Sequence, residues 1–388
     1  MLPKDIHEKE SLLIAGIMSG TSLDGIDVAF VEISGEPGKP DYRLRSFHSV
    51  PYNPALREQL LKAYDGTLPS RDVFHLDKLL GDRYASAVKN GAIEAGISMA
   101  AIDVVGLHGQ TIYHDPPNGV TVQIGSAAVV AEELHTVVID DFRTADIVAG
   151  GEGAPLVPFC DVMLLAHPSR NRIALNIGGI ANLTWLPAGT SIENLVGFDT
   201  GPGNALIDAA MRELRGLDFD EEGKLASEGS VDQRLLLSVL SDAWFQTPPP
   251  KSTGRELFGE ERGREIARRA RADEIEDATV IRTLTQVTAR SIIEALERFI
   301  VPCREIDEIV VSGGGAKNST LMQALVELAP ETSIITSDSL GLPGDAKEAI
   351  GFALLAWATL HGVHNNVPSV TGASGKRLLG SIRCPKVV

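Results

Sequence analysis

The sequence has few cysteines, and none of them has a metal-ligand spacing. Its three cysteines, Cys160, Cys303 and Cys384, lie far apart along 388 residues. An odd number of isolated cysteines forms no disulfide framework, and the histidines show no HExxH or related spacing. This scarcity excludes a disulfide scaffold, disfavours a transition-metal site and favours a reducing compartment.

Basic charge and long apolar runs are also scarce. There are 35 Lys and Arg against 52 Asp and Glu, which gives a net charge of −17. A field of this sign repels nucleic-acid phosphates and anionic membranes. No apolar run approaches the ~20 residues needed to cross a bilayer, and the first ten residues mix acids with bases instead of forming a secretory signal. We therefore expect a cytoplasmic protein with neither nucleic acid nor membrane as partner.

What is present is a regular alternation of strand and helix patterns, which predicts an α/β chain. An apolar strand, a glycine-centred turn and a second apolar strand occur at 12–33 and again at 172–187. This repetition predicts a duplicated domain with a cleft between the copies. A Gly/Pro-rich stretch after Thr136 favours a domain crossing there. The predicted domains are 1–137, with the tail 372–388 free to return to it, and 138–371 with a helical insertion around 218–273.

The first hairpin has an unusually polar tip. Its turn carries Ser19, Gly20, Thr21 and Ser22, where backbone N–H groups can converge on a phosphate. An ordinary hairpin turn has the same composition, so this alternative stays open. Asp24 and Asp27 follow at positions that suit a magnesium ion held through water, although a surface turn aspartate explains Asp24 equally well.

Two further glycine turns follow apolar strands. Asn176 precedes Gly178 and Gly179, and a strand followed by a glycine turn and a helix places Gly313 to Gly315 at a helix N-terminus. The pattern is neither GxGxxG nor GxxxxGK[ST], so neither a Rossmann nor a Walker site follows. Three such turns together favour a nucleotide site.

Asp199 is the candidate proton acceptor, because GFDTGPGN predicts a rigid loop that exposes one acid. A cap for the helix that begins near Ala205 is the alternative. No GxSxG or nucleophilic cysteine motif is present, which disfavours hydrolases.

Polar residues on other glycine-rich segments are candidates for substrate contacts. Arg143 in DFRTAD and Glu152 in GGEGAP suit a polar substrate, with an interdomain ion pair as the alternative. His108 and Gln110 in GLHGQT are placed on a glycine-flanked turn, where a structural role for the histidine is equally open.

These motifs together resemble one family. GIMSGTSLDGIDVAF, GLHGQTIYHDP, DFRTADIVAGGEGAPLVP, LNIGGIANLTWL, GFDTGPGNALIDA, PPKSTGRELF and VSGGGAKNSTLM are similar to the bacterial anhydro-N-acetylmuramic acid kinases, in order and over nearly the whole chain. The resemblance implies two actin-like (ribonuclease H-like) domains that close over a nucleotide, and a homodimer. It also implies that ATP and water convert a 1,6-anhydro amino sugar into its 6-phosphate in cell-wall recycling, with Mg²⁺ bound through the nucleotide phosphates.

The resemblance also implies roles for individual residues. It places the first phosphate turn on Ser19 to Asp24, the second on Gly178 and Gly179, and the catalytic base on Asp199, while Arg143 and Glu348 contact the sugar. The full candidate set is phosphate, Ser19, Gly20, Thr21, Ser22, Asp24, Asn176, Gly178, Gly179; adenosine side, Gly313, Gly314, Gly315, Asn318; sugar, His108, Arg143, Glu152, Glu348; and base, Asp199.

Three matters stay open at this point. Many superfamily relatives have an aspartate in DxGxT where this chain has Met18 and Ser19, so the acid that positions magnesium is undecided. A kinase for levoglucosan or another anhydro sugar is the nearest alternative function, and a nucleotide-driven binding protein is a more distant one. The role of the PPPKSTGRELF loop, residues 248–258, is also open.

Overall fold

A computed structural model describes residues 6, 8–189, 195–302 and 304–386. Cys303 therefore lies outside the described residues. The chain forms two compact units: unit 1 consists of Met1–Met163 and Ala346–Val388, and unit 2 of Leu164–Asp345. Each unit is built around one mixed β-sheet.

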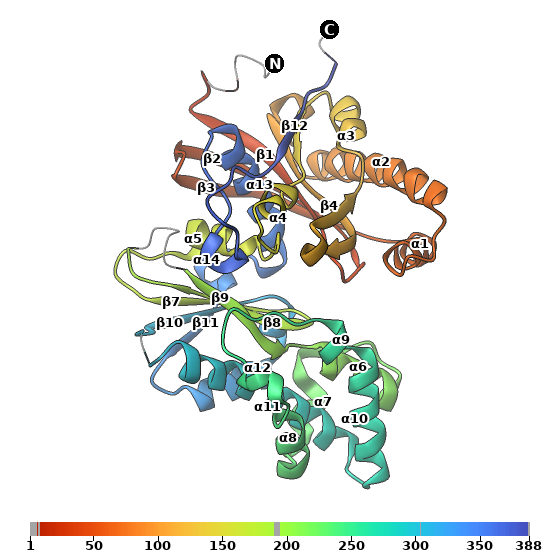
Figure 1. The fold of residues 1–388 in the computed structure, drawn as a ribbon, viewed down its shortest axis with the longest axis vertical. Coiled ribbons are helices and arrows are strands. Elements are labelled where there is room, and N and C mark those ends of the chain that lie inside the picture. Colours follow the sequence, from red (N-terminus) through yellow and green to blue (C-terminus); the bar gives the residue numbers. More distant parts are fainter. Residues whose placement is uncertain (1–5, 7, 190–194, 303, 387–388) are drawn as a thin grey trace. The chain divides into compact units, whose positions relative to one another are not determined.

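The sheet of unit 1 has the order β12-β6-β4-β1-β2-β3, with β5 paired to β4 (Figure 1). β1, β2 and β3 are antiparallel neighbours, whereas β4 and β6 run parallel to β1. The predicted first hairpin is therefore confirmed. The strands are β1 Ser11–Ser19, β2 Gly25–Glu36, β3 Lys39–Pro51, β4 Val104–Asp115, β5 Val120–Ile124, β6 Val137–Asp140 and β12 Ser381–Arg383.

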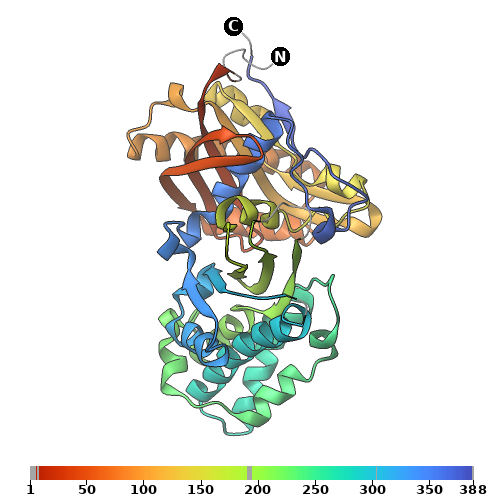
Figure 2. The ribbon, with the colours of Figure 1, turned by 90° about the vertical axis from the view of Figure 1, so that its left-hand side faces the viewer.

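Helices cover both faces of this sheet, because successive residues of a strand point to opposite sides. Ala15 and Ile17 of β1 belong to a core shared with α1, α2 and α3. Gly16, between them, faces α13, where a Cβ atom would collide with the Ala349 carbonyl oxygen. Both views show α13 in blue against the red strands (Figure 1, Figure 2). The helices are α1 Pro54–Tyr64, α2 Ser70–Glu94, α3 Ala127–Leu134, α4 Thr144–Val148, α5 Val157–Leu165, α13 Lys347–Leu360 and α14 Pro368–Thr371.

The sheet of unit 2 repeats the central topology of unit 1. Its order is β11-β10-β7-β8-β9, in which β7, β8 and β9 are antiparallel and β10 and β11 run parallel to β7. The same succession of three antiparallel and two parallel strands in both units confirms the predicted duplication of an actin-like, ribonuclease H-like α/β domain. The strands are β7 Arg172–Ile177, β8 Ile180–Leu186, β9 Val196–Pro202, β10 Glu308–Ser312 and β11 Ser333–Thr336.

Two hydrophobic cores lie in the part of unit 2 that the structure describes. In the first, α11 and α12 pack on the sheet through residues such as Ile292 and Leu321. In the second, the helical insertion packs with α6 and the first half of α11, around residues such as Met211, Phe258 and Ile281. The helices are α6 Ala205–Arg215, α7 Lys224–Glu228, α8 Gln233–Leu240, α9 Arg255–Phe258, α10 Glu260–Ala272, α11 Asp277–Phe299 and α12 Ser319–Leu328.

The units differ from the expected domains 1–137 and 138–371. The chain leaves unit 1 within α5, because α4 and the loop after it bond to the returning segment. Asp146 of α4 accepts from the Thr371 hydroxyl, and Glu152 N–H donates to the Thr371 carbonyl. It returns before α13, which packs on β1, and not only at the tail. The tail does return as expected, because β12 pairs with β6.

Strand β3 was not expected from the sequence, although KPDYRLRSFHSVP alternates exposed and half-buried residues along most of its length. Such an edge strand buries little, so its apolar pattern is weak. Among the described residues, no helix combines the length and the apolar composition that spanning a bilayer requires.

Candidate active site

The turn after β1 is fixed by hydrogen bonds at its first residue. Ser19 is buried, and its hydroxyl lies 2.7 Å from the Tyr84 hydroxyl and donates to the Gly109 carbonyl at 2.9 Å. The Ser19 side chain is thus used inside unit 1, and its contribution to a phosphate site is limited to its main chain. Thr21 and Ser22 in the same turn are exposed.

Strand β4 carries a bulge opposite the end of β1. Ile17 pairs with Leu107 and Ser19 with Gln110, so two residues of β4 lie opposite one of β1. Gly109 occupies the bulge with φ +78°. His108 and Gln110 therefore lie in a strand and not in the expected turn, a correction that follows from the pairing of β4 with both β1 and β5.

The bulge lets both side chains reach the phosphate-type turn. Gln110 donates from Nε2 to the Gly20 carbonyl at 3.0 Å, and His108 Nδ1 lies 3.2 Å from the Ser19 carbonyl. Asp24, at the other end of the turn, accepts a bond of 2.7 Å from the Ser22 hydroxyl. The turn is therefore held at both ends while its middle stays exposed.

Arg143 connects His108 to the GGEGAP segment. Its Nε and one terminal nitrogen lie 3.2 and 2.8 Å from His108 Nε2, and its other terminal nitrogen donates to the Gly153 carbonyl at 2.7 Å. Because an arginine only donates, Nε2 of His108 accepts and Nδ1 carries the proton that bonds Ser19. Burial, reinforced by Arg143, lowers the pKa of His108 to about 3. Burial also lowers the pKa of Arg143 to about 10, so the arginine stays charged at neutral pH.

The exposed Glu152 lies on a loop that a buried carboxylate holds. Asp146 of α4 accepts bonds from Gly153 N–H at 2.9 Å and from Asn366 and Thr371 side chains at 2.8 Å each. The main chain of Glu152 bonds to Thr371 as well. These bonds hold the DFRTAD and GGEGAP segments together as one structural element.

Glu348 lies in the first turn of α13, next to a buried ion pair. Lys347 Nζ is 2.6 Å from an Asp161 carboxylate oxygen, and both side chains are almost fully buried. The Glu348 side chain reaches the surface, yet burial of its carboxyl raises its pKa, with Lys347 and Arg143 opposing the shift and Asp27 and Asp24 adding to it. Glu348 is therefore electrostatically coupled to the phosphate-type turn and to Arg143, a grouping that sequence distance alone does not reveal.

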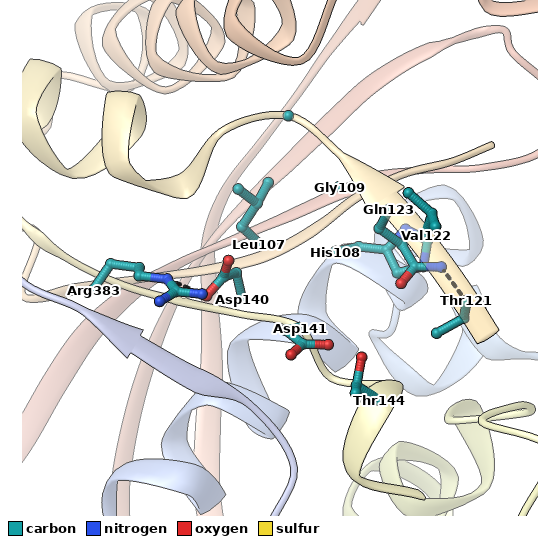
Figure 3. A pocket seen from close by; sticks show the side chains of 11 residues that line it. Leu107, His108, Gly109, Thr121, Val122, Gln123, Asp140, Asp141, Thr144 and Arg383 are labelled. Carbon is teal, nitrogen blue, oxygen red and sulfur yellow. Dashed lines mark hydrogen bonds and ion pairs between the residues drawn. The ribbon is translucent and has the colours of Figure 1, made fainter. Parts of the chain in front are cut away.

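A polar pocket of about 210 Å³ lies beside His108, at the carboxyl end of β6 (Figure 3). Asp141 and Thr144 come from the segment after β6, and Gln123 and Thr121 from β5. Open α/β sheets bind ligands at the carboxyl ends of their strands. The pocket therefore places the polar side chains of these four residues beside His108, one of the candidate sugar-binding residues.

In unit 2, the Gly178–Gly179 turn is held by backbone hydrogen bonds. The Gly178 carbonyl accepts from Asn204 N–H, and the Gly179 carbonyl accepts from Gly203 and Ala205 N–H, at 2.8 to 3.1 Å. The turn is thereby fixed to the N-terminus of α6.

The structure brings the Gly313 turn next to this one. A Cβ atom on Gly313 would lie 2.7 Å from the Ile177 carbonyl oxygen and 2.8 Å from Asn176 Oδ1, so the close approach requires glycine, as does φ +82°. Two of the three predicted glycine turns therefore lie side by side. Asn318, in contrast, is the N-cap of α12: its side-chain oxygen accepts from Leu321 N–H at 2.9 Å.

Asp199 lies in strand β9, not in the expected loop, because β9 pairs with β8 and places Asp199 opposite Asn182. It does not cap α6; instead its Oδ2 accepts from Thr253 N–H at 2.9 Å, and its own N–H donates to the Lys251 carbonyl at 3.2 Å. Burial raises its pKa from 3.8 to about 6, opposed by the Thr253 bond and Lys251 and increased by Glu256. This carboxyl can accept a proton near neutral pH.

Lys251 is a residue that the sequence did not single out. Its ammonium lies 4.2 Å from the centroid of the Trp244 ring and 5.1 Å from that of Phe299, and it donates to the Phe245 carbonyl at 3.4 Å. Burial lowers its pKa to about 8, with Arg298 adding to the shift and Asp199 opposing it. The sequence gives one indication of its importance: Lys251 lies in the Pro-rich loop 248–258, to which the sequence assigns no role.

The chain is similar to one protein family over nearly its whole length. The sequence model of the anhydro-N-acetylmuramic acid kinase family matches residues 12–385. An anhydro-N-acetylmuramic acid kinase of Caldanaerobacter subterraneus subsp. tengcongensis is 40% identical over 391 residues, which cover 97% of this chain and 98% of that protein. Its counterpart in Bacillus cereus (strain AH820) is 42% identical over 386 residues, 97% of this chain and 100% of that protein.

Among solved structures, component A of the (R)-2-hydroxyglutaryl-CoA dehydratase of Acidaminococcus fermentans aligns with a TM-score of 0.46. Its sequence is 12% identical, and the alignment covers 89% of this chain and 98% of that one. This likeness is too low to bear on function.

Proposed function

The chain belongs to the anhydro-N-acetylmuramic acid kinase family, and from this premise we propose that it uses ATP and water to convert 1,6-anhydro-N-acetylmuramic acid into N-acetylmuramic acid 6-phosphate. The relatives are curated under that sugar's name, which disfavours levoglucosan as the substrate. The expected place of the reaction is the recycling of cell-wall sugars.

The observation that carries the mechanism is the environment of Asp199. A carboxylate held by Thr253 N–H, with a pKa of about 6, is ionised at neutral pH and is still basic enough to take a proton. We propose that Asp199 accepts the proton of a water molecule whose oxygen bonds to the anomeric carbon. The bond between that carbon and O6 breaks, O6 bonds to the γ-phosphorus, and the bond from this phosphorus to the β-γ bridging oxygen breaks to release ADP.

Backbone turns would stabilise the charge on the transferred phosphoryl group. The exposed middle of the Ser19 to Asp24 turn in unit 1 and the fixed Gly178–Gly179 turn in unit 2 suit this task, because backbone N–H groups that need no reorganisation stabilise developing charge best. The adjacent Gly313 turn suits the adenosine side of the nucleotide. For Asn318, the capping bond in α12 supports a role in fixing that segment.

The sugar would be bound by the polar set of unit 1. Arg143 stays cationic, so the N–H groups that do not bond His108 or the Gly153 carbonyl can bind hydroxyl or carboxylate oxygens of the sugar. His108 stays neutral above about pH 3, and its Nε2 orients the guanidinium for that contact. Glu152 and Glu348 supply acceptors for sugar hydroxyls.

The acidic residues near the phosphate-type turn of unit 1 suit a magnesium ion that keeps most of its water ligands. Asp24 and Asp27 offer hard oxygen atoms near the phosphate-type turn, while within the described ranges no group of three or more His, Cys, Asp or Glu could hold a metal by itself. We propose that the ion is bound mainly through the nucleotide phosphates, with Asp24 or Asp27 reached through water. When bound, it would neutralise phosphate charge. The homodimer remains a prediction of the family resemblance.

The proposal is tested by mass spectrometry of the product formed with MgATP and, separately, anhydro-N-acetylmuramic acid, levoglucosan or no sugar. We expect a product equal to sugar plus water plus phosphate from the first compound alone. Product from levoglucosan alone would move the substrate, and ATP turnover without a sugar product would contradict the proposed function.

A further inference from the structure

We propose that Lys251 is a positioning residue for the proposed reaction: its main chain fixes the backbone of Asp199, and its caged ammonium keeps the Asp199 side chain in the carboxylate form. This inference rests on the proposed function, in which Asp199 takes a proton from water. It assigns a task to the loop 248–258, whose role the sequence left open.

The first support is the geometry of the main chain. The Lys251 carbonyl accepts from Asp199 N–H at 3.2 Å, and Thr253 N–H donates to Asp199 Oδ2 at 2.9 Å. The segment from Lys251 to Thr253 therefore holds both the backbone and the carboxylate of a residue that lies more than fifty positions earlier. A change in this segment must be transmitted to Asp199.

The second support is the cage around the ammonium. Trp244 and Phe299 present their rings to Lys251 Nζ at 4.2 and 5.1 Å, and Phe198, the neighbour of Asp199 on β9, does so at 6.0 Å. A cation in such a cage is attracted to the ring faces, and its screening by water is reduced. Lys251 as a whole residue is 9% exposed, so it is not a solvated surface charge.

The charged groups around Asp199 and Lys251 determine in which direction the pKa of Asp199 should move when Lys251 is made neutral. Asp199 interacts with Lys251, which favours its ionised form, and with Glu256 of α9, which opposes it. Lys251 interacts with Asp199 and with Arg298 of α11, whose guanidinium also donates to the Phe245 carbonyl, at 3.5 Å. Removing the Lys251 charge should therefore raise the pKa of Asp199, whereas removing the Arg298 charge should leave it nearly unchanged.

Two neutral variants and one charged variant test the proposal in the full chain. Lys251→Met keeps the apolar stem, Lys251→Gln keeps a donor for the Phe245 carbonyl, and Lys251→Arg keeps the charge. In both neutral variants we expect the acid limb of kcat/KM to move up by about one pH unit, which at pH 6 is about a fivefold loss with little change at pH 8.5. Lys251→Arg should retain most of the wild-type limb. Arg298→Met is the matched control, since it removes an equal charge bonded to the same carbonyl.

A readout without substrate separates this proposal from the proposed function. The Asp199 carboxyl, labelled with ¹³C and assigned by comparison with Asp199→Asn, is titrated by NMR in the wild type and the same variants. An upward shift in both neutral variants, absent in Arg298→Met, supports the proposal even if no anhydro sugar reacts, a result that would remove only the proposed function. Unchanged titration of Asp199 in the neutral variants would overturn it, as would equal losses in all three Lys251 variants at every pH.

Discussion

Burial shifts the pKa values of candidate residues in both units, but with different consequences for their charge at neutral pH. In unit 1, burial leaves His108 neutral, with a pKa of about 3, and Arg143 charged, with a pKa of about 10. In unit 2, burial brings the pKa of Asp199 to about 6 and that of Lys251 to about 8. The same physical cause, desolvation, therefore fixes charge states in one unit and makes them responsive near neutral pH in the other. This difference suits unit 1 to binding and unit 2 to proton transfer.

Removing the candidate base tests whether unit 2 supplies the proton acceptor. Asp199→Asn should lower kcat by about 10²–10⁴-fold, because general-base catalysis is lost, while ATP binding stays near the wild-type level. Steady-state kinetics and nucleotide titration calorimetry measure the two effects. Asp208→Asn is the matched control, since burial also raises the pKa of Asp208, to about 7, outside the candidate site. Equal losses in both variants would contradict the assignment of Asp199.

In unit 1, the corresponding test replaces the guanidinium group of Arg143, which bonds two partners at once. One ammonium cannot replace the guanidinium bonds to both His108 and the Gly153 carbonyl, so Arg143→Lys should raise KM for the sugar by about 10–100-fold, with a smaller change in kcat. Initial-rate kinetics at saturating ATP measure this. The exposed Arg45→Lys serves as control. A fall in kcat with unchanged KM would place Arg143 in the chemical step instead.

The pH profile tests both regimes together. kcat/KM should fall about tenfold per pH unit below about 6, as the Asp199 carboxylate is protonated. His108 stays neutral throughout this range, so His108→Gln should lower activity without moving that limb. Rates measured from pH 4.5 to 8.5 check this. If the limb disappears in the His108 variant, the division between the two units is wrong.

The smallest effect concerns stability. Because the folded state raises the pKa of Asp199 from 3.8 to about 6, the folded protein binds the proton more tightly than the unfolded chain does. The carboxylate thus destabilises the fold increasingly as pH rises from about 4 to above 6. Asp199→Asn should therefore increase the unfolding free energy by about 1–2 kcal/mol at pH 7.5 and by little at pH 4. Thermal unfolding at both values measures it, and an equal gain at both would contradict the shift.

Much of the fold followed from local patterns. The two glycine-tipped hairpins predicted the duplicated domain, and the strand orders confirm it. The sequence does not predict strand β3, because an edge strand buries few side chains and its apolar pattern is weak. It predicts a turn at His108 because the glycine at position 109, which forms a bulge within β4, resembles a turn glycine in the sequence. The Lys251 cage could not be predicted, since its rings come from segments that only the folded helices bring together.

By itself, the sequence determined the family, the repeated α/β topology and the identity of Asp199 as the candidate base, because these depend on residue types at short spacing. The tertiary structure decided the rest: that α13 belongs with β1, that Arg143 bonds His108, and that the loop 248–258 holds Asp199. Proton affinity depends on burial and on charges from distant segments, and both arise only when the chain has folded.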